Sequence, residues 1–288
     1  PLPESSIGFA PSVREALVVT VTALTQPPPR RYTGTQMIDL HCHILPGLDD
    51  GAQTMEDSLD MARTAVGDGI HTIAATPHAD KWGAHPDEED LERQVAQLQE
   101  ALDAKGIPIR VVPGLENHLT PDLVSGRIVP LNHTRYFLVE LPFEEFPHYV
   151  EQALFQLQLK GYTPILAHPE RNAVLRSDPE ALRGLVERGI LAQLTAASLL
   201  GVFGKKTREA SESYLRQGLL QVLATDSHSA TGGRRPILSE ALAVAARLIG
   251  PERAQALVTE NPERILKGEA VEVETAVAAR PRRWGFWK

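Results

Sequence analysis

A repeated unit, in which an apolar strand ends at a histidine or a carboxylate and an amphipathic helix follows, most constrains how this chain folds. In the first unit, residues 37–40 (MIDL) lead into His41, Cys42 and His43. Side chains two positions apart on a strand point to the same side, so both histidines can reach one ion. Cys42 points the other way, which favours packing over ligation. The recurrence of such strand ends strengthens the case for a metal site beyond that of one His-x-His pair.

Apolar runs, helical spacing and terminating glycines predict seven strands separated by helices. The predicted strands are residues 37–40, 71–76, 107–112, 136–139, 163–167, 190–195 and 220–225. The predicted helices are residues 57–66, 87–105, 149–160, 179–188, 205–216, 239–249, 252–258 and 261–267. Alternating strands and helices predict an α/β fold with a parallel sheet. Seven such units in about 230 residues favour a distorted seven-stranded (β/α) barrel over an open sheet.

The barrel domain is predicted to cover residues 37–268, because the first strand opens at Met37. Residues 1–36 are predicted to be an extension outside the core; a short helix around residues 14–24, packed on the barrel, is the alternative. Residues 269–288 are predicted to be a polar tail. The basic and aromatic end of this tail, residues 280–288, leaves docking to a partner or to an acidic membrane surface as the alternative.

The composition excludes several classes of protein. The formal net charge of −8 argues against a nucleic-acid binder. The single cysteine excludes an internal disulfide, so nothing requires an oxidising compartment. No apolar run approaches the roughly 20 residues that span a bilayer, so we expect a cytoplasmic protein that does not span the membrane. The sequence leaves open whether the chain forms a homo-oligomer.

Histidines and carboxylates stand at six of the seven predicted strand ends, and the strand at residues 190–195 carries none. In a parallel barrel these ends meet at the face that holds the active site. Imidazole and carboxylate without thiolate suit Mn²⁺, Fe²⁺ or Zn²⁺, and nine candidates are enough for two or three ions. Such ions offset buried negative charge, activate water and hold a phosphate, so the predicted chemistry is hydrolysis of a phosphate ester. The candidate ligands are His41, His43, Asp50, His78, Glu116, Glu140, His168, Asp226 and His228.

Other histidines are predicted to lie outside the site, with His148 kept as a fallback proton donor because its loop faces the same mouth. The remaining four are His71, at the wrong end of a strand, and His85, His118 and His133, in loops.

Arginines near the candidate ligands are predicted to bind the phosphate. Arg171 follows His168 by three residues, and its planar fork matches two phosphate oxygens; an ion pair with Glu170 is the alternative. Arg234 or Arg235 is the second candidate, and the sequence does not tell which of them faces the site. Cys42 is not predicted to be a nucleophile, because no Cys-x5-Arg loop follows it.

Six motifs together resemble the PHP (polymerase and histidinol phosphatase) superfamily. They are residues 41–43 (HCH), 49–51 (DDG), 76–78 (TPH), 114–116 (GLE), 167–171 (AHPER) and 225–228 (TDSH). The DDG and HPER motifs, residues 194–201 (LTAASLLG) and residues 234–236 (RRP) more narrowly resemble the bacterial capsule- and exopolysaccharide-type metal-dependent protein-tyrosine phosphatases. The resemblance covers about residues 37–268.

This resemblance implies a PHP-type barrel that holds three divalent ions, usually manganese. It implies that the first ion binds His41, His43, Glu116 and Asp226, the second Glu116, Glu140 and His168, and the third Asp50, His78 and His228. The implied activity is hydrolysis of phosphotyrosine in proteins that regulate capsular or exopolysaccharide synthesis, and the implied partner is the phosphotyrosine tail of a bacterial tyrosine kinase. The alternatives are a small-molecule phosphatase of the histidinol-phosphatase kind and a non-catalytic structural PHP domain, which missing ligands would indicate.

Overall fold

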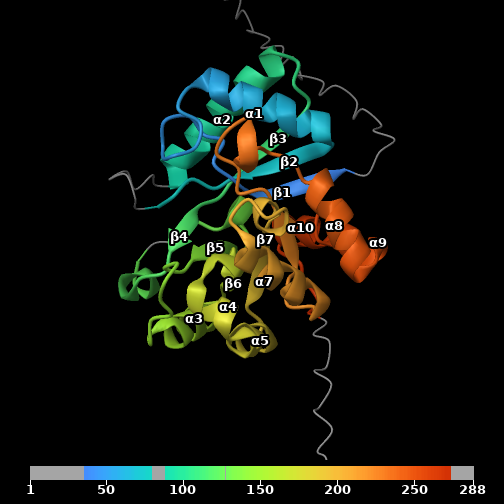
Figure 1. Ribbon diagram of the computed structural model, residues 1–288. Helices are drawn as coiled ribbons and strands as arrows, with labels where there is room; N and C mark the ends of the chain where they lie inside the picture. The colour runs from blue at the N-terminus through green and yellow to red at the C-terminus, as the bar shows by residue number, and fades with distance from the viewer. Residues whose placement is uncertain (1–35, 80–87, 127, 274–288) are drawn as a thin grey trace, which may run out of the picture. The chain divides into compact units, whose positions relative to one another are not determined.

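The computed structural model describes residues 36–79, 88–126 and 128–273 (Figure 1). Residues 1–35 of the predicted extension and residues 274–288 of the predicted tail lie outside these ranges, so both of these assignments stay predictions. Among the described residues, none of the helices has the length and apolar character needed to cross a membrane.

In the part of the chain that the structure describes, eight parallel strands form two sheets, one of three strands in the order β1-β2-β3 and one of five in the order β4-β5-β6-β7-β8. Every neighbouring pair is parallel. The strands are β1 Met37–Cys42, β2 Ile70–Ala75, β3 Arg110–Pro113, β4 Glu116–His118, β5 Tyr136–Glu140, β6 Thr163–Ala167, β7 Leu191–Thr195 and β8 Val222–Ala224.

The strand count differs from the predicted seven, because the third predicted strand is followed by a separate one. Pro113 ends β3, and after Gly114 and Leu115 the chain starts β4 at Glu116. Gly114 lies against Leu131, so closely that a Cβ there would be 2.5 Å from a Leu131 side-chain atom. Proline and glycine commonly interrupt a strand, and here they allow Glu116 to begin a new one.

Hydrogen bonds join the two sheets where the strands end. On one side, the Asp226 amide donates to the His41 carbonyl (2.8 Å) and the His43 amide donates to the Ser227 carbonyl (2.9 Å). On the other side, the Glu116 amide donates to the carbonyl of Pro77, just past β2 (3.0 Å). The carboxyl ends of β1, β2 and β8 therefore meet the start of β4, and the candidate ligands come together there.

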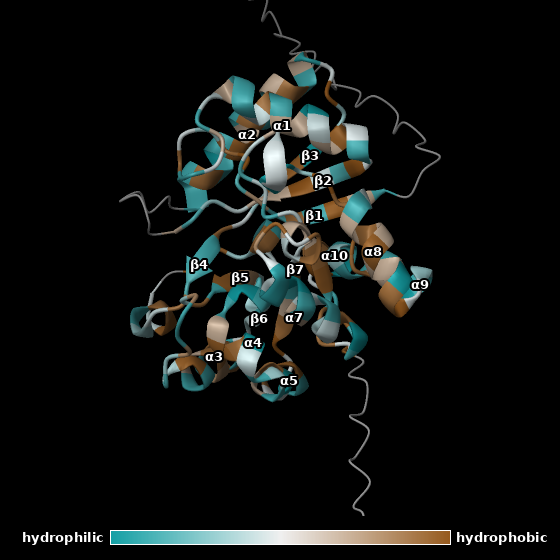
Figure 2. Cartoon of the chain, in the orientation of Figure 1, coloured by the Kyte–Doolittle hydropathy of each residue, from teal (hydrophilic) through white to brown (hydrophobic). Residues whose placement is uncertain are grey.

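Apolar side chains from seven of the eight strands form one cluster that the strands enclose. Its members include Ile38, Ala74, Val112, Leu138, Ile165, Leu191 and Val222, and Ile265 and Leu266 also join it. A larger apolar cluster fills the space between the strands and the helices. Figure 2 shows the apolar colour on most of the strands, the hydrophilic colour on β4, and mixed faces on α1 and α2. A common interior shared by strands of both sheets is the arrangement expected of a barrel.

Ten helices are present in the described part of the chain. They are α1 Met55–Asp68, α2 Glu88–Ala104, α3 Val150–Leu159, α4 Ala173–Ser177, α5 Pro179–Glu187, α6 Ala196–Leu199, α7 Lys205–Arg216, α8 Ser239–Ile249, α9 Pro251–Ala256 and α10 Glu260–Lys267. Short 3₁₀ turns are η1 Pro121–Val124, η2 Leu131–His133, η3 Pro169–Arg171 and η4 Gly232–Arg234. All eight predicted helices are present, whereas α4 and α6 are too short to show a helical period in the sequence.

Local sequence signals account for the helix that follows the first ligand loop. Thr54 and Asp57 form a reciprocal capping box at the start of α1, and Gly69 ends the helix with a left-handed φ of 92°. Helix α1 contacts β2, and α2 contacts β3 (Figure 1). The three-stranded sheet is thereby covered by the helices that connect its own strands.

Candidate metal centre

Four side chains form what we call the inner cluster: His41, His43, Glu116 and Asp226. All four are at most 1% exposed. The Nε2 atoms of His41 and His43 lie 3.2 Å apart, and they lie 3.3 and 3.5 Å from Glu116 Oε2. The same two atoms are 3.6 and 3.5 Å from Asp226 Oδ1. Two imidazoles and two carboxylates thus point at one small volume.

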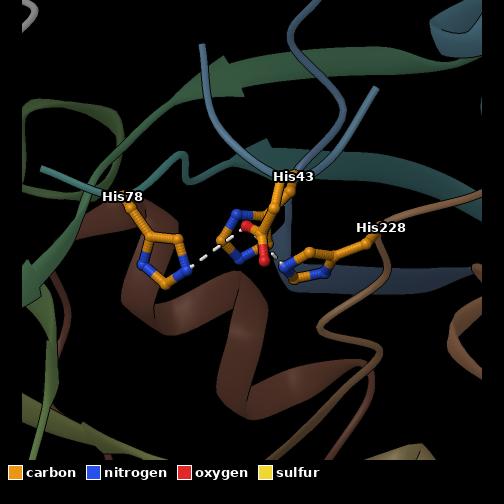
Figure 3. A group of neighbouring side chains, drawn as sticks. His43, His78 and His228 are labelled. Carbon is orange, nitrogen blue, oxygen red and sulfur yellow. Dashed lines mark ion pairs between the residues drawn. The ribbon is translucent and has the colours of Figure 1, made fainter. Parts of the chain in front are cut away.

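A second group, which we call the outer cluster, consists of Asp50, His78 and His228. Asp50 Oδ1 lies 3.2 Å from His228 Nε2 and 3.6 Å from His78 Nε2. With His43, these residues offer ligand atoms that all lie within 4.8 Å of one another. Figure 3 shows the imidazoles of His43, His78 and His228 turned toward one another. The Asp50 side chain is 44% exposed, so this cluster is open to solvent.

Glu116 also reaches the two remaining candidates, Glu140 and His168. His168 Nε2 lies 2.9 Å from Glu116 Oε1 and 3.7 Å from Glu140 Oε1. Glu116 therefore presents Oε1 to His168 and Oε2 to the inner cluster. All nine candidate ligands predicted from the sequence consequently lie in one connected group.

The donor set fits divalent cations. Glu116 Oε2 is buried and has no hydrogen-bond partner among the described residues, although nitrogens of His41 and His78 lie 3.3 and 2.9 Å from it. Ligand atoms that lie close together without a hydrogen bond between them are typical of a site for a shared cation. The group contains imidazole and carboxylate and no thiolate, which suits Mn²⁺, Fe²⁺ and Zn²⁺ alike.

Electrostatics keep the buried carboxylates of the inner cluster ionised. Burial raises the pKa of Asp226, but the nearby His41, His43 and Arg234 outweigh it and bring the pKa well below its usual value. Burial also raises the pKa of Glu116, but the nearby His41 and His168 outweigh this effect. The pKa of Glu116 is therefore also well below its usual value. Ionised carboxylates are the form that binds a cation.

Two side chains that orient the inner histidines were not recognised as such in the sequence. His43 Nδ1 lies 2.6 Å from Asp49 Oδ2, and His41 Nδ1 lies 2.9 Å from Gln193 Oε1. Each contact leaves Nε2 directed at the inner cluster, as in other metal sites with second-layer partners. Gln193 lies on β7, the strand that carries no ligand. Its signal in the sequence is a glutamine inside an otherwise apolar strand.

Unusual backbone conformations position two of the ligands. His168 and Asp226 have positive φ values of 34° and 50°, in the left-handed region that non-glycine residues rarely adopt. Gly51 is equally constrained, because a Cβ there would lie 2.1 Å from the His43 carbonyl oxygen. The loop that carries Asp49 and Asp50 can therefore lie directly on His43 only with glycine at position 51.

Two of the three candidate arginines reach the cluster. Arg171 Nη1 lies 2.9 Å from Asp226 Oδ2, and Arg234 Nη2 lies 2.9 Å from Asp226 Oδ1. Arg235, predicted as the alternative to Arg234, instead places Nη2 2.8 Å from Glu240 Oε1 on an exposed surface. Arg234 ends the 3₁₀ turn η4 and the backbone of Arg235 is extended, so the two side chains point to different sides and Arg235 is not brought to the site. The alternative pair of Arg171 with Glu170 is also not formed, because Glu170 is buried and accepts from the Thr195 amide.

The remaining histidines and the cysteine mostly lie where the sequence indicated. His71 contacts the Met37 carbonyl at the start of β2, and His148 is exposed beside Tyr149. His133 lies near Glu88 and Glu92, away from the nine candidates. Cys42 Sγ is 3.0 Å from Ser227 Oγ, and burial raises the pKa of its thiol well above the usual value.

His118 is an exception among these histidines, because it lies next to the site. It is on β4, and its Nδ1 is 3.5 Å from Glu140 Oε2. The prediction that His118 lies in a loop outside the site is wrong, because a strand begins at Glu116 and carries both residues on one side. His85 lies outside the described residues.

Comparisons with known proteins give a family and relatives for most of the chain. The family model for capsular polysaccharide synthesis, CpsB/CapC, matches residues 37–267. Tyrosine-protein phosphatase YwqE of Bacillus subtilis is 42% identical over 240 residues, which cover 82% of this chain and 93% of that protein. Tyrosine-protein phosphatase CpsB of Streptococcus agalactiae serotype V is 27% identical over 244 residues, 82% of this chain and all of that protein.

Solved structures extend the comparison to the fold. A structure from work on YwqE of Bacillus subtilis and CpsB of Streptococcus pneumoniae, described as unique metal-dependent tyrosine phosphatases, aligns with a TM-score of 0.79 and 40% identity. That alignment covers 83% of this chain and 97% of the other. The phosphotriesterase homology protein of Escherichia coli aligns with a TM-score of 0.55 at 11% identity, over 82% of this chain and all of that one. The second likeness shows a shared fold only.

Proposed function

The chain belongs to the CpsB/CapC family of capsular polysaccharide synthesis proteins, and we propose that it is a metal-dependent phosphatase that hydrolyses phosphotyrosine in proteins. The observation that carries the proposal is that nine candidate metal ligands form one connected group and that two guanidinium groups contact one of these ligands, Asp226. The names of the relatives, which are tyrosine-protein phosphatases, support the substrate class. A non-catalytic domain would not need the complete ligand set.

We assign three divalent ions to the nine candidates. The inner cluster would hold the first ion, Glu116 with Glu140 and His168 the second, and the outer cluster the third. Manganese is our first choice, with iron or zinc as alternatives. When bound, such ions supply an activated water and neutralise charge that develops on the phosphate oxygens.

The side chains of this protein bind and orient the phosphate. Arg171 and Arg234 both contact Asp226, so their guanidiniums are held beside the ligands before a substrate arrives. A guanidinium fork matches two phosphate oxygens and stays charged at any working pH. The phenolate of tyrosine, with a parent pKa near 10, leaves with less acid assistance than an alkoxide does. Because little acid assistance is needed, the exposed position of His148, the fallback proton donor, is compatible with turnover.

The partner that we propose is the phosphotyrosine tail of a bacterial tyrosine kinase, in the regulation of capsular or exopolysaccharide synthesis in the cytoplasm. The description of the family model as capsular polysaccharide synthesis supports this role. The acidic net charge of −8 disfavours a nucleic-acid substrate.

The test is turnover of a phosphotyrosine peptide beside histidinol phosphate, by chelator-treated protein with and without added Mn²⁺. We expect Mn²⁺-dependent release of phosphate from the peptide. Arg171→Ala and Arg234→Ala should each lower kcat/KM by roughly a hundredfold, because a positioned cationic donor is lost. Arg235→Ala is the matched control, since its guanidinium pairs with Glu240, and it should retain activity.

Preference for histidinol phosphate would refute the proposed substrate while leaving the metal site intact. Lack of turnover of both compounds by metal-loaded protein would refute the phosphatase function itself. A loss in Arg235→Ala as large as in Arg234→Ala would refute the assignment of Arg234 to the phosphate.

A further inference from the structure

The guanidinium of Arg171 lies against two phenylalanine rings. Its Cζ is 4.5 Å from the centroid of Phe143, in the loop after β5, and 4.5 Å from the centroid of Phe203, in the loop before α7. Arg234 Cζ lies 6.0 Å from the same Phe203 ring. Both distances at Arg171 are within the range of cation–π contacts. The two loops thus bring aromatic rings to the arginines that we assign to the phosphate.

Two further apolar side chains belong to segments that contact this edge of the site. Val174 follows Ala173, whose amide donates to the Phe143 carbonyl (2.6 Å). Val202 packs on Gly233, where a Cβ would lie 2.9 Å from Val202 Cγ1, and Gly233 precedes Arg234. We call Phe143, Val174, Val202 and Phe203 the apolar rim.

The apolar rim is unusually open to solvent. Phe143, Val174 and Val202 are 36%, 37% and 50% exposed, and they are three of the five large apolar side chains that are exposed in the described residues. Phe203 is partly buried, and holding Arg171 in place requires neither the exposure of the Phe143 ring nor the two valines. Exposed apolar side chains gathered beside a polar site are typical of a surface that binds an apolar group of a ligand.

We propose that the apolar rim binds the phenyl ring of the substrate, with Phe143 and Phe203 as specificity-determining residues that favour aryl over alkyl phosphates. This inference rests on the proposed phosphatase function and names the part of the substrate that the rim recognises. In phosphotyrosine the ring is joined to the phosphate through one oxygen, so a phosphate held by Arg171 carries its ring directly onto the rim. An alkyl phosphate such as phosphoserine places only a methylene there.

The spacing of the two rings suits this role. Because both centroids lie 4.5 Å from Arg171 Cζ, they are no further apart than twice that distance. Aromatic rings pair with centroids about 4.5 to 7 Å apart. A substrate ring that enters above the guanidinium can therefore contact Phe143 and Phe203 together.

The test compares two inhibitors with the same charged group, phenylphosphonate and methylphosphonate, by calorimetric binding to the Mn²⁺-loaded full chain. The phosphonate reports on the arginines and ions, and the substituent reports on the rim. We expect wild-type protein to prefer the phenyl compound by roughly tenfold, and Phe143→Leu and Phe203→Leu each to reduce this preference about threefold or more. Affinity for methylphosphonate should stay within about twofold of wild type in both variants.

Phe155→Leu is the matched control, because Phe155 is 58% exposed on α3, whose contacts are with β6 and η1. It should leave both affinities unchanged. Turnover of a phosphotyrosine peptide is measured in parallel, so that loss of the proposed function is distinguished from loss of ring recognition.

Two results would overturn the rim proposal alone: an unchanged phenyl preference in both leucine variants, or an equal loss of both phosphonates, which would mean that the rings only hold Arg171. A wild-type protein that binds both phosphonates but hydrolyses no phosphotyrosine peptide would refute the proposed function, and the rim proposal with it.

Discussion

The inner and outer clusters are built from the same residue types but differ in burial and support. His41, His43, Glu116 and Asp226 are almost fully buried, and their histidines are oriented by Asp49 and Gln193. In the outer cluster, Asp50 is 44% exposed, and His228 Nδ1 contacts the Asp226 carbonyl oxygen (3.0 Å) and Asp226 Oδ1 (3.6 Å), both on its own segment. The protein framework therefore fixes the inner geometry, whereas solvent reaches the outer one.

This difference in burial predicts how tightly each cluster holds its ions. A buried carboxylate group without cations is costly, so the inner ions should be tightly bound and hard to replace. The outer ion should exchange more readily, because water can substitute for an exposed ligand. The exposed side of the site is also the one from which a phosphate can approach.

The largest effect should come from the residue shared by two of the proposed ions. Glu116→Gln removes the charge that faces His168 on one side and the inner histidines on the other. Loss of several kcal/mol of ion-mediated stabilisation corresponds to a roughly thousandfold or greater fall in kcat/KM. Metal analysis after desalting should show a lower ion content per chain than in wild type.

Glu92→Gln is the matched control for Glu116→Gln. Glu92 belongs to the exposed group with Glu88 and His133, which is the only other set of at least three such residues close enough to hold an ion within the described segments. Activity and metal content should be unchanged. Full activity in Glu116→Gln would overturn its bridging assignment.

The next effect should come from the support of the inner cluster. Asp49→Asn keeps the shape of the side chain but weakens the hold on His43 Nδ1, 2.6 Å away. Carboxylates that orient a ligating histidine typically contribute tenfold to a hundredfold in metal affinity. We expect a loss in that range in Mn²⁺ titrations, with little change in kcat at saturating metal. An affinity equal to wild type would show that the Asp49 contact does not hold His43.

A smaller and reversible effect is expected in the outer cluster. Asp50→Asn removes a partly exposed carboxylate whose pKa is lowered mainly by its hydrogen bond to His228. We expect about a tenfold loss of activity at limiting Mn²⁺, since exposed charge contributes little and excess ion restores occupancy by mass action. Activity measured across a Mn²⁺ series should converge on wild type. A loss that persists at saturating Mn²⁺ would mean that the outer ion does not exchange more readily than the inner ones.

A contrast between apolar and polar segments explains how much of the fold and of the site the sequence could predict. The strands that end in ligands were recognisable because each is an apolar run that stops at a histidine or carboxylate. Strand β4 was not recognisable, because its three residues, Glu116, Asn117 and His118, are polar and show no strand pattern. The partners Gln193 and His41 are 152 positions apart, and only the folded arrangement of the two sheets brings them together. Arg234 and Arg235 differ only in the side to which a turn directs them.

The smallest effect on activity, and a clear one on stability, is expected at Asp39 beneath the inner cluster. This carboxylate is fully buried and accepts hydrogen bonds from the amides of His41 (3.3 Å) and Thr225 (2.9 Å) and from the Thr225 hydroxyl. Burial raises its pKa from 3.8 to about 6. The folded state therefore binds a proton more tightly than the unfolded state, and stability from this group falls as the pH rises from about 4 through 6. The contribution of Asp39 to the free energy of unfolding falls by about 3 kcal/mol at most over this pH range.

Asp39→Asn isolates this contribution, because asparagine can accept from both amides and cannot ionise. In urea unfolding of metal-free protein, the free energy of unfolding of the variant should rise relative to wild type between pH 4 and pH 7, toward the 3 kcal/mol limit. Changes in the other carboxylates, such as Asp226, cancel in this difference, because both proteins contain them. If the difference between variant and wild type is the same at both pH values, then the pKa of Asp39 is the same in the folded and the unfolded chain, and its three hydrogen bonds offset the cost of burying its charge.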